Sequence, residues 1–128
     1  MHHDELDIRS SILRKLGRHR EALRCSREAL SRKGISADSR VLLEMGVGEA
    51  MDALDREDAA QDAYDRALEH WSVVRPTTSV RLYRSYASHL KRIGNEKMAR
   101  FFLAEASRIA GINNLGDQVL KIDAAKDH

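Results

Sequence analysis

Cys25 is the single cysteine of this sequence, and a thiol nucleophile needs a nearby histidine to remove its proton. His19 stands six residues earlier, in or beside a predicted turn, and this spacing does not place both residues on one helix face. We therefore expect Cys25 to be a small, half-buried helix residue. The sequence predicts no catalytic residue, and we do not expect an enzyme.

The other residues that could carry chemistry are six histidines and one short glycine pair. The histidines stand at positions 2, 3, 19, 70, 89 and 128, without the helical pairing that a metal site needs. We expect His70 and His89 at helix surfaces. Gly46-Val47-Gly48 falls inside a predicted helix, where small side chains serve packing, and Trp71 is expected to pack between repeats. The sequence thus predicts no metal and no cofactor.

Composition narrows the class of protein further. The 128 residues are 42% hydrophobic and 33% charged, with one proline, which favours a soluble helical protein over a disordered one. No apolar run approaches the roughly 18 residues of a membrane span, and the N-terminus does not resemble a secretory signal. A single cysteine excludes an internal disulfide. We expect a cytoplasmic protein that does not enter a membrane.

The chain contains an internal repeat with a period of 38 and 39 residues. Its copies can be aligned on three reference residues, Gly17, Asp55 and Gly94. Four further columns then match in residue type. Before the reference residue stand a small residue at −7 (Ser10, Gly48 and Ala87) and a large apolar one at −4 (Leu13, Met51 and Leu90). After it stand alanines at +5 (Ala22, Ala60 and Ala99) and at +12 (Ala29, Ala67 and Ala106).

The spacing of these columns predicts helix–turn–helix hairpins. Alanines seven residues apart share a helix face, so two antiparallel helices can approach closely, with the reference residue in the turn between them. Lys33-Gly34-Ile35-Ser36 reads as a helix end followed by a Ser36 N-cap. We expect helices over about 4–16, 19–33, 37–54, 57–73, 77–93, 96–110 and 114–125, and no sheet.

These columns resemble the tetratricopeptide repeat (TPR) family over residues 3–110. The third copy matches best, through Tyr83, Tyr86-Ala87, Leu90, Gly94, Ala99, Leu103 and Ala106. The second has Glu44 where an aromatic is usual, and the first has Arg9 and Ser26 at apolar positions. The period exceeds the ~34 residues typical of the family. The resemblance implies an all-α, right-handed α-solenoid of three antiparallel hairpins, with repeats at about 3–34, 37–74 and 77–110.

A C-terminal capping helix is expected over about 114–125, because Leu115, Val119 and Ile122 stand at helical spacing. We expect one domain over 1–128. The first helix has no upstream cap, which suggests either a domain excised from a longer protein or a face that packs on a partner. A second copy, joined through this N-terminal face or through the C-terminal helix, is the corresponding alternative.

Charge is distributed unevenly between the repeats. Residues 1–34 hold nine basic and five acidic side chains, residues 35–74 three and ten, and residues 75–110 eight and two. Attraction between neighbouring repeats and steering of a charged ligand both fit this pattern. The resemblance places a binding groove on the first helix of each hairpin. We expect it to be lined by Arg14 and Lys15, by Met45, Glu49 and Asp52, and by Arg81, Arg84, Ser88, Lys91 and Arg92, with Asp4, Asp7 and Ser11 in the first repeat.

These observations favour a protein–protein interaction module without catalytic activity. Its groove would bind a peptide or a partner helix, and the basic rim favours an acidic one. The alternative is a sensory or oligomerisation domain of a larger regulator, such as a transcriptional regulator, whose effector domain is missing from this chain. Nucleic acid is not expected as a partner, because the acidic middle repeat would repel a phosphate backbone.

Overall fold

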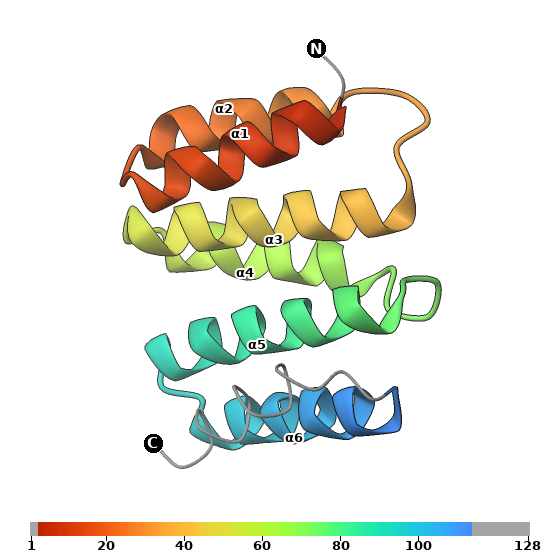
Figure 1. Cartoon of the computed structure of the whole chain (residues 1–128). Coiled ribbons are helices and arrows are strands. Elements are labelled where there is room, and N and C mark those ends of the chain that lie inside the picture. Colours follow the sequence, from red (N-terminus) through yellow and green to blue (C-terminus); the bar gives the residue numbers. More distant parts are fainter. Residues whose placement is uncertain (1–2, 114–128) are drawn as a thin grey trace. The chain divides into compact units, whose positions relative to one another are not determined.

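The computed structural model describes residues 3–113 of the chain, with side chains described from Ile8 onward. This described part contains six α-helices and no strand (Figure 1). The helices are α1 (His3–Lys15), α2 (His19–Leu30), α3 (Ala37–Ala53), α4 (Glu57–Leu68), α5 (Pro76–Arg92) and α6 (Glu96–Ile112). The predicted all-α fold is confirmed. The predicted capping helix over 114–125 lies outside the described residues.

Three turns, which join α1 to α2, α3 to α4 and α5 to α6, share one backbone geometry. The reference residues of the sequence comparison lie in them with positive φ: Gly17 at +77°, Asp55 at +60° and Gly94 at +85°. In each turn the following amide donates to a carbonyl five residues earlier, from Arg18 to Leu13, from Arg56 to Met51 and from Asn95 to Leu90, each at 2.8 Å. This pattern is a Schellman helix end. The turns therefore form through backbone hydrogen bonds common to all three hairpins.

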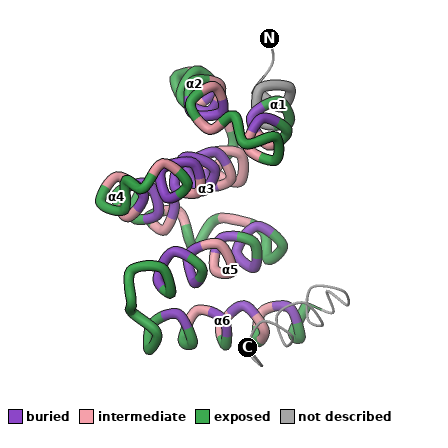
Figure 2. The backbone as a smooth tube through the Cα atoms, turned by 90° about the vertical axis from the view of Figure 1, so that its left-hand side faces the viewer, coloured by how far each residue is buried: buried purple, intermediate pink, exposed green. Residues whose placement is uncertain are grey.

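The small residues of the repeated columns lie inside the protein. Ala22, Ala60 and Ala99 are at most 1% exposed, and Ala29, Ala67 and Ala106 are fully buried. A methyl side chain lets two helix backbones approach closely, and Figure 2 shows buried residues recurring along α2, α4 and α6, whereas α3 is buried over most of its middle. The burial of these alanines, on which the hairpin prediction depended, is confirmed.

The described residues group into two compact units, and the first spans residues 1–73. In this unit α1 packs on α2 and α3 on α4, while α3 also contacts α2 and α1. The core contains Leu23, Val47, Ala50, Met51, Ala60 and Ala63. A Cβ at Gly48 would lie 2.6 Å from the Tyr64 ring, so the glycine is needed for the contact between α3 and α4. The predicted packing role of this glycine is confirmed.

In the first unit, two buried polar pairs include residues that stand where the repeat pattern favours an apolar or aromatic side chain, Ser26 and Glu44. Ser26 is 1% exposed, and its Oγ lies 2.7 Å from that of Ser10, whose hydroxyl also lies 3.1 Å from the Ala22 carbonyl. Glu44 is buried and accepts a hydrogen bond from Arg66 Nε at 3.0 Å. Each buried polar group is thus satisfied by a partner on a neighbouring helix.

The second unit, which begins at Val74, contains the hairpin of α5 and α6. Pro76 occupies the first turn of α5, and Arg75 precedes it in extended conformation, so the helix starts one residue before the predicted residue 77. Val80, Ala106 and Ala110 form a small core. Beside it, the Phe102 ring centroid lies 5.2 Å from that of Tyr83 and 4.9 Å from that of Tyr86.

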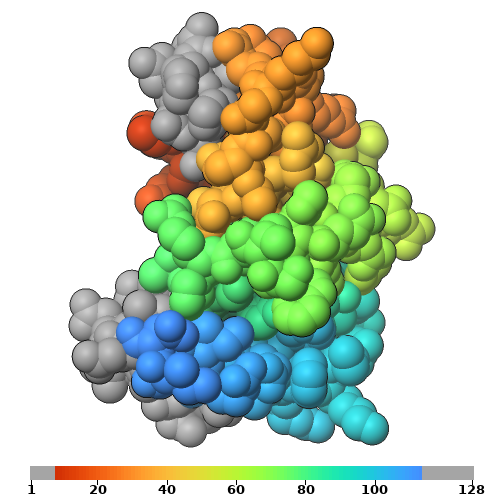
Figure 3. Space-filling view, turned by 90° about the vertical axis from the view of Figure 1, so that its right-hand side faces the viewer, coloured from red at the N-terminus to blue at the C-terminus, as the bar shows by residue number. Residues whose placement is uncertain are grey.

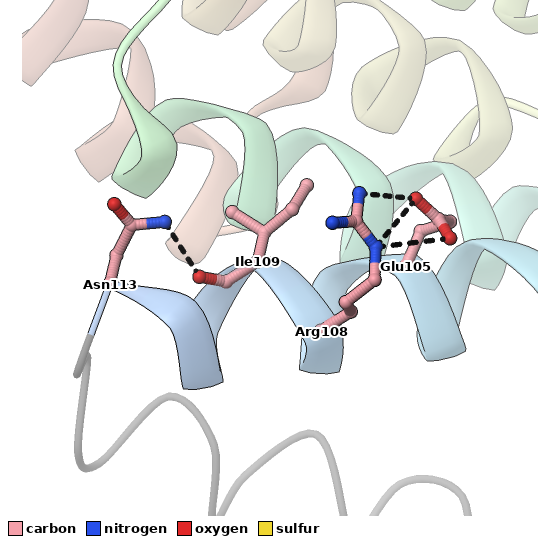
Figure 4. Close-up of polar contacts among 4 residues, drawn as sticks. All are labelled: Glu105, Arg108, Ile109 and Asn113. Carbon is pink, nitrogen blue, oxygen red and sulfur yellow. Dashed lines mark hydrogen bonds and ion pairs between the residues drawn. The ribbon is translucent and has the colours of Figure 1, made fainter.

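The last turns of α6 carry two local polar contacts (Figure 4). Arg108 donates to both carboxylate oxygens of Glu105, at 2.9 Å from its closest nitrogen. Asn113 donates from its side-chain amide to the Ile109 carbonyl at 2.8 Å, and it is the C-cap of the helix. Helix α6 therefore ends at Ile112, two residues beyond the predicted end at residue 110.

Three sequence predictions about the later part of the chain were wrong. Helix α4 ends at Leu68 and not at residue 73, and the segment that follows lies on the surface, in green in Figure 3. Trp71 is 64% exposed, so it is not a packing residue. His89 is 1% exposed, whereas a surface position was expected. The prediction of one domain over 1–128 stays a prediction.

Candidate functional site between α1 and α3

A cavity of about 290 Å³ lies in the first unit, between α1 and α3. It is lined by Ser11, Arg14, Lys15, His19 and Glu49. Four of these residues were predicted from the sequence to line one groove, and the structure brings them together: Ser11, Arg14, Lys15 and Glu49. The cavity is therefore a candidate binding site of this unit.

The spacing of residues along α1 determines which side chains reach the cavity. Ser11, Arg14 and Lys15 stand three and four residues apart, so they share one side of the helix. Leu13 and Ser10 are buried at 7% and 0% exposure, and Arg14 donates to Ser10 Oγ at 3.5 Å. His19 begins α2 directly after the Schellman turn, and this turn brings the imidazole to the same cavity.

Arg14 is held in place by a glycine and a carboxylate of α3. Its side chain is 13% exposed, and Nε lies 3.6 Å from Glu49 Oε2. The guanidinium occupies the space that a Cβ at Gly46 would need. An arginine buried to this degree needs a counter-charge, which Glu49 supplies. Gly46 and Glu49 together therefore fix the orientation of Arg14.

Two polar groups of the cavity remain available for a ligand. Lys15 is exposed, and no ion pair is formed by its ammonium group with the described residues. His19 has a buried Nδ1 without a hydrogen-bond partner there. A buried polar atom without a partner costs free energy, which a hydrogen-bonding ligand would recover. The cavity can thus bind a group that accepts hydrogen bonds and carries negative charge.

The predicted groove residues of the third repeat lie on α5, in the second unit. Arg81, Ser88, Lys91 and Arg92 are exposed, and Arg84 is half-buried. Ser88 donates to the Arg84 carbonyl at 3.3 Å, which is a contact within the helix. This basic face presents its cations to solvent as expected. A groove continuous over all three repeats stays a prediction.

Two predicted groove residues of α3 are not accessible. Met45 is 4% exposed and Asp52 is 9% exposed, although both were expected to face a ligand. The reason is that α3 is the central helix of its unit, in contact with α4, α2 and α1, so little of its surface remains open. Glu49 is half-buried, and it is the α3 residue that lines the cavity. The side chains of Asp4 and Asp7 lie outside the described set.

His19 is the site residue whose role the sequence did not reveal. The sequence pointed to His19 only as a possible proton acceptor for Cys25. Cys25 itself is half-buried on α2, as predicted. The signal that could have found it is its position two residues after Gly17, where a tight turn returns the chain to the end of α1. No group of three or more histidine, cysteine or acidic side chains in the described part could hold a metal ion.

Comparison with family models, with curated proteins and with solved structures found no match for this chain. None of the described helices combines the length and the apolar character that crossing a bilayer requires.

Proposed function

We propose that this chain is a protein–protein interaction module without catalytic activity, which binds an acidic peptide or partner helix at the cavity between α1 and α3. The observation that carries this proposal is the meeting of Lys15, His19 and the oriented Arg14 in one cavity. A carboxylate of the ligand would accept hydrogen bonds from Lys15 and His19. The tetratricopeptide-like solenoid and a reducing, cytoplasmic setting remain part of the proposal.

The charged side chains that line the cavity support an acidic side chain of a peptide as the ligand group. Pockets for small molecules usually enclose ~300–1,000 Å³ and are mainly apolar. This cavity, of about 290 Å³, has a charged lining and is large enough for one or two side chains. The ligand would therefore insert an acidic side chain here.

The proposal can be tested with arrayed peptides of random sequence, probed with the full chain. We expect retained peptides to be enriched in Asp and Glu. In fluorescence anisotropy, Lys15→Glu should weaken the best peptide at least tenfold, which corresponds to about 1.4 kcal/mol. His19→Ala should weaken it by less, because it removes a hydrogen bond but introduces no repulsion.

A matched control is Lys97→Glu, which makes the same charge change at an exposed position of α6. We expect Lys97→Glu to retain the affinity within about twofold, since Lys97 does not line the cavity and an exposed charge is screened by salt. Equal affinities of the Lys15→Glu and Lys97→Glu chains would reject the cavity as the site. A double change, Arg84→Glu with Lys91→Glu, tests the face of α5 in the same assay.

A further inference from the structure

The cavity between α1 and α3 holds hydrogen-bonding side chains that the described residues leave unused. Ser11 and Lys15 line it, and neither side chain forms a hydrogen bond or an ion pair with another described residue. His19 lines it as well, and its buried Nδ1 has no hydrogen-bond partner in the same part of the chain. These three side chains come from α1 and from the first turn of α2, so they approach the cavity from separate positions.

Arg14 offers the same cavity one nitrogen of its guanidinium. Its Nε lies 3.6 Å from Glu49 Oε2, and its Nη1 donates to Ser10 Oγ at 3.5 Å. Nη2 is therefore the nitrogen that has no partner among the described residues. Arginine holds a carboxylate best through two parallel N–H bonds from two nitrogens. With two of its nitrogens engaged, Arg14 is placed to give an anion one bond and not this bidentate grip.

Single donors on four separate side chains suit a phosphate better than a carboxylate. A carboxylate has two oxygens in one plane, whereas a phosphoryl group presents three strong acceptor oxygens pointing in different directions. We infer that the cavity binds the phosphoryl group of a phosphorylated serine or threonine in the partner peptide. The inference rests on the proposed function, and it names the acidic group that the cavity prefers.

The charges around the cavity can balance a phosphate dianion. The carboxylate of Glu49 faces Arg14, so these two charges compensate each other. Lys15 supplies a further cation, and the imidazole of His19 donates from Nδ1 when this nitrogen carries a proton. A phosphoserine carries a charge of about −1.5 to −2 near pH 7, which favours the imidazolium form of a histidine beside it. Lys15 and a protonated His19 together match this charge.

The test uses the full chain and three peptide libraries of random flanking sequence, with phosphoserine, glutamate or serine fixed at the centre. We expect the best phosphoserine peptide to bind about tenfold more tightly in fluorescence anisotropy than the same peptide with glutamate, and the serine version to bind least. Equal or tighter binding of the glutamate version would overturn the inference while leaving the acidic-peptide proposal in place. If the wild type retains none of the libraries better than the Lys15→Glu chain does, both proposals are overturned.

Ser11→Ala tests the donors that distinguish the two anions. It should weaken the phosphoserine peptide about tenfold and the glutamate peptide by less than about twofold, because a third oxygen then loses its donor. Alanine favours a helix, so the circular dichroism should not change. Ser88→Ala, at an exposed position of α5, is the matched control and should bind both peptides like the wild type. An equal loss for both peptides in Ser11→Ala would overturn the inference.

Competition with inorganic phosphate identifies the source of the phosphoryl group. A phosphorylated side chain brings the contacts of its peptide with it, so inorganic phosphate should displace the labelled phosphoserine peptide only at a much higher concentration than the unlabelled peptide does. Displacement by inorganic phosphate at an equal or lower concentration would identify free phosphate as the ligand, and it would overturn a peptide as the source.

Discussion

The guanidinium of Arg14 lies over Gly46, in the space that any side chain at position 46 would occupy. The two residues belong to different hairpins of the first unit, so the missing side chain of one helix positions a cation of another. Glu49, three residues beyond Gly46, completes the arrangement at 3.6 Å. Gly46 can therefore be changed to test the site without touching any side chain that would meet a ligand.

Gly46→Ala should weaken peptide binding while leaving stability nearly unchanged. The new methyl group would displace the far end of a flexible side chain, and alanine gains about 1 kcal/mol over glycine in a helix interior. We expect the melting temperature to stay within about 4 °C of the wild type, and the affinity for an acidic peptide to fall several-fold. A loss of stability without a loss of affinity would contradict the role assigned to Arg14.

Gly48→Ala is the matched substitution and should have the opposite profile. Its Cβ would meet the Tyr64 ring at 2.6 Å, and this ring is 1% exposed and cannot move away. Overpacking of this kind costs about 1–3 kcal/mol. Urea unfolding should show the loss as a lower midpoint with an unchanged slope. A stability equal to that of the wild type would mean that α3 and α4 can separate at low cost.

Asp55→Gly should stabilise the protein. Asp55 has φ of +60°, while glycines occupy the same turn position in the other two hairpins. Glycine reaches this conformation without steric cost, and we expect a gain of about 0.5 kcal/mol in the free energy of unfolding. The reciprocal changes Gly17→Ala and Gly94→Ala should each cost about 1 kcal/mol. Thermal melts of the three variants would measure both effects, and a destabilised Asp55→Gly chain would show that the side chain contributes more than the strain.

Ser10 and Ser26 should behave as a coupled pair in a double-mutant cycle. Ser26→Ala leaves the buried hydroxyl of Ser10 with one fewer partner, at a cost of about 1 kcal/mol. The double change, Ser10→Ala with Ser26→Ala, removes both hydroxyl groups and should cost less than the sum of the single changes. Additive free energies from denaturant unfolding would show that the 2.7 Å contact contributes nothing to stability.

Tyr83 should titrate above the usual range of a phenol. Burial raises the pKa of Tyr83 above 10.0, the carboxylate of Glu105 raises it further, and Arg108 partly opposes this. Since the folded pKa is the higher one, the stability from this group is complete below pH 10 and is lost as the pH rises through the folded pKa. Ultraviolet titration of phenolate should show a lower pKa for Tyr83 in Glu105→Gln, and Tyr83→Phe identifies its transition. An unchanged titration in Glu105→Gln would exclude the carboxylate as a cause.

Much of the local architecture could be predicted because it depends on short-range patterns. The buried alanines follow from the helical period, and the turn residues from their tolerance of positive φ. Ser36 caps α3 as expected, since its Oγ accepts from the Ser39 amide at 3.1 Å. These features involve residues within one or two turns of each other.

The errors concern residues whose environment depends on distant parts of the chain. Met45 and His89 have positions that suit exposure by helical period, yet both are buried. Trp71 is apolar but follows the end of α4, where the chain no longer has a helix face to bury it. Four of the five residues that line the α1–α3 cavity were predicted from the sequence, because they lie on the first helices of two hairpins, whereas His19 enters the cavity only through the turn.

One residue in each hairpin belongs to both helices at once. Arg18, Arg56 and Asn95 close the Schellman end of one helix through their amides, and their carbonyls accept the first bond of the next from Ala22, Ala60 and Ala99. Their backbone angles agree closely, with ψ of 64°, 72° and 71°. Because no further residue separates the two helices, fraying of one helix must disturb the other. Amide exchange with deuterated solvent should therefore release both helices of a hairpin together, as one cooperative unit.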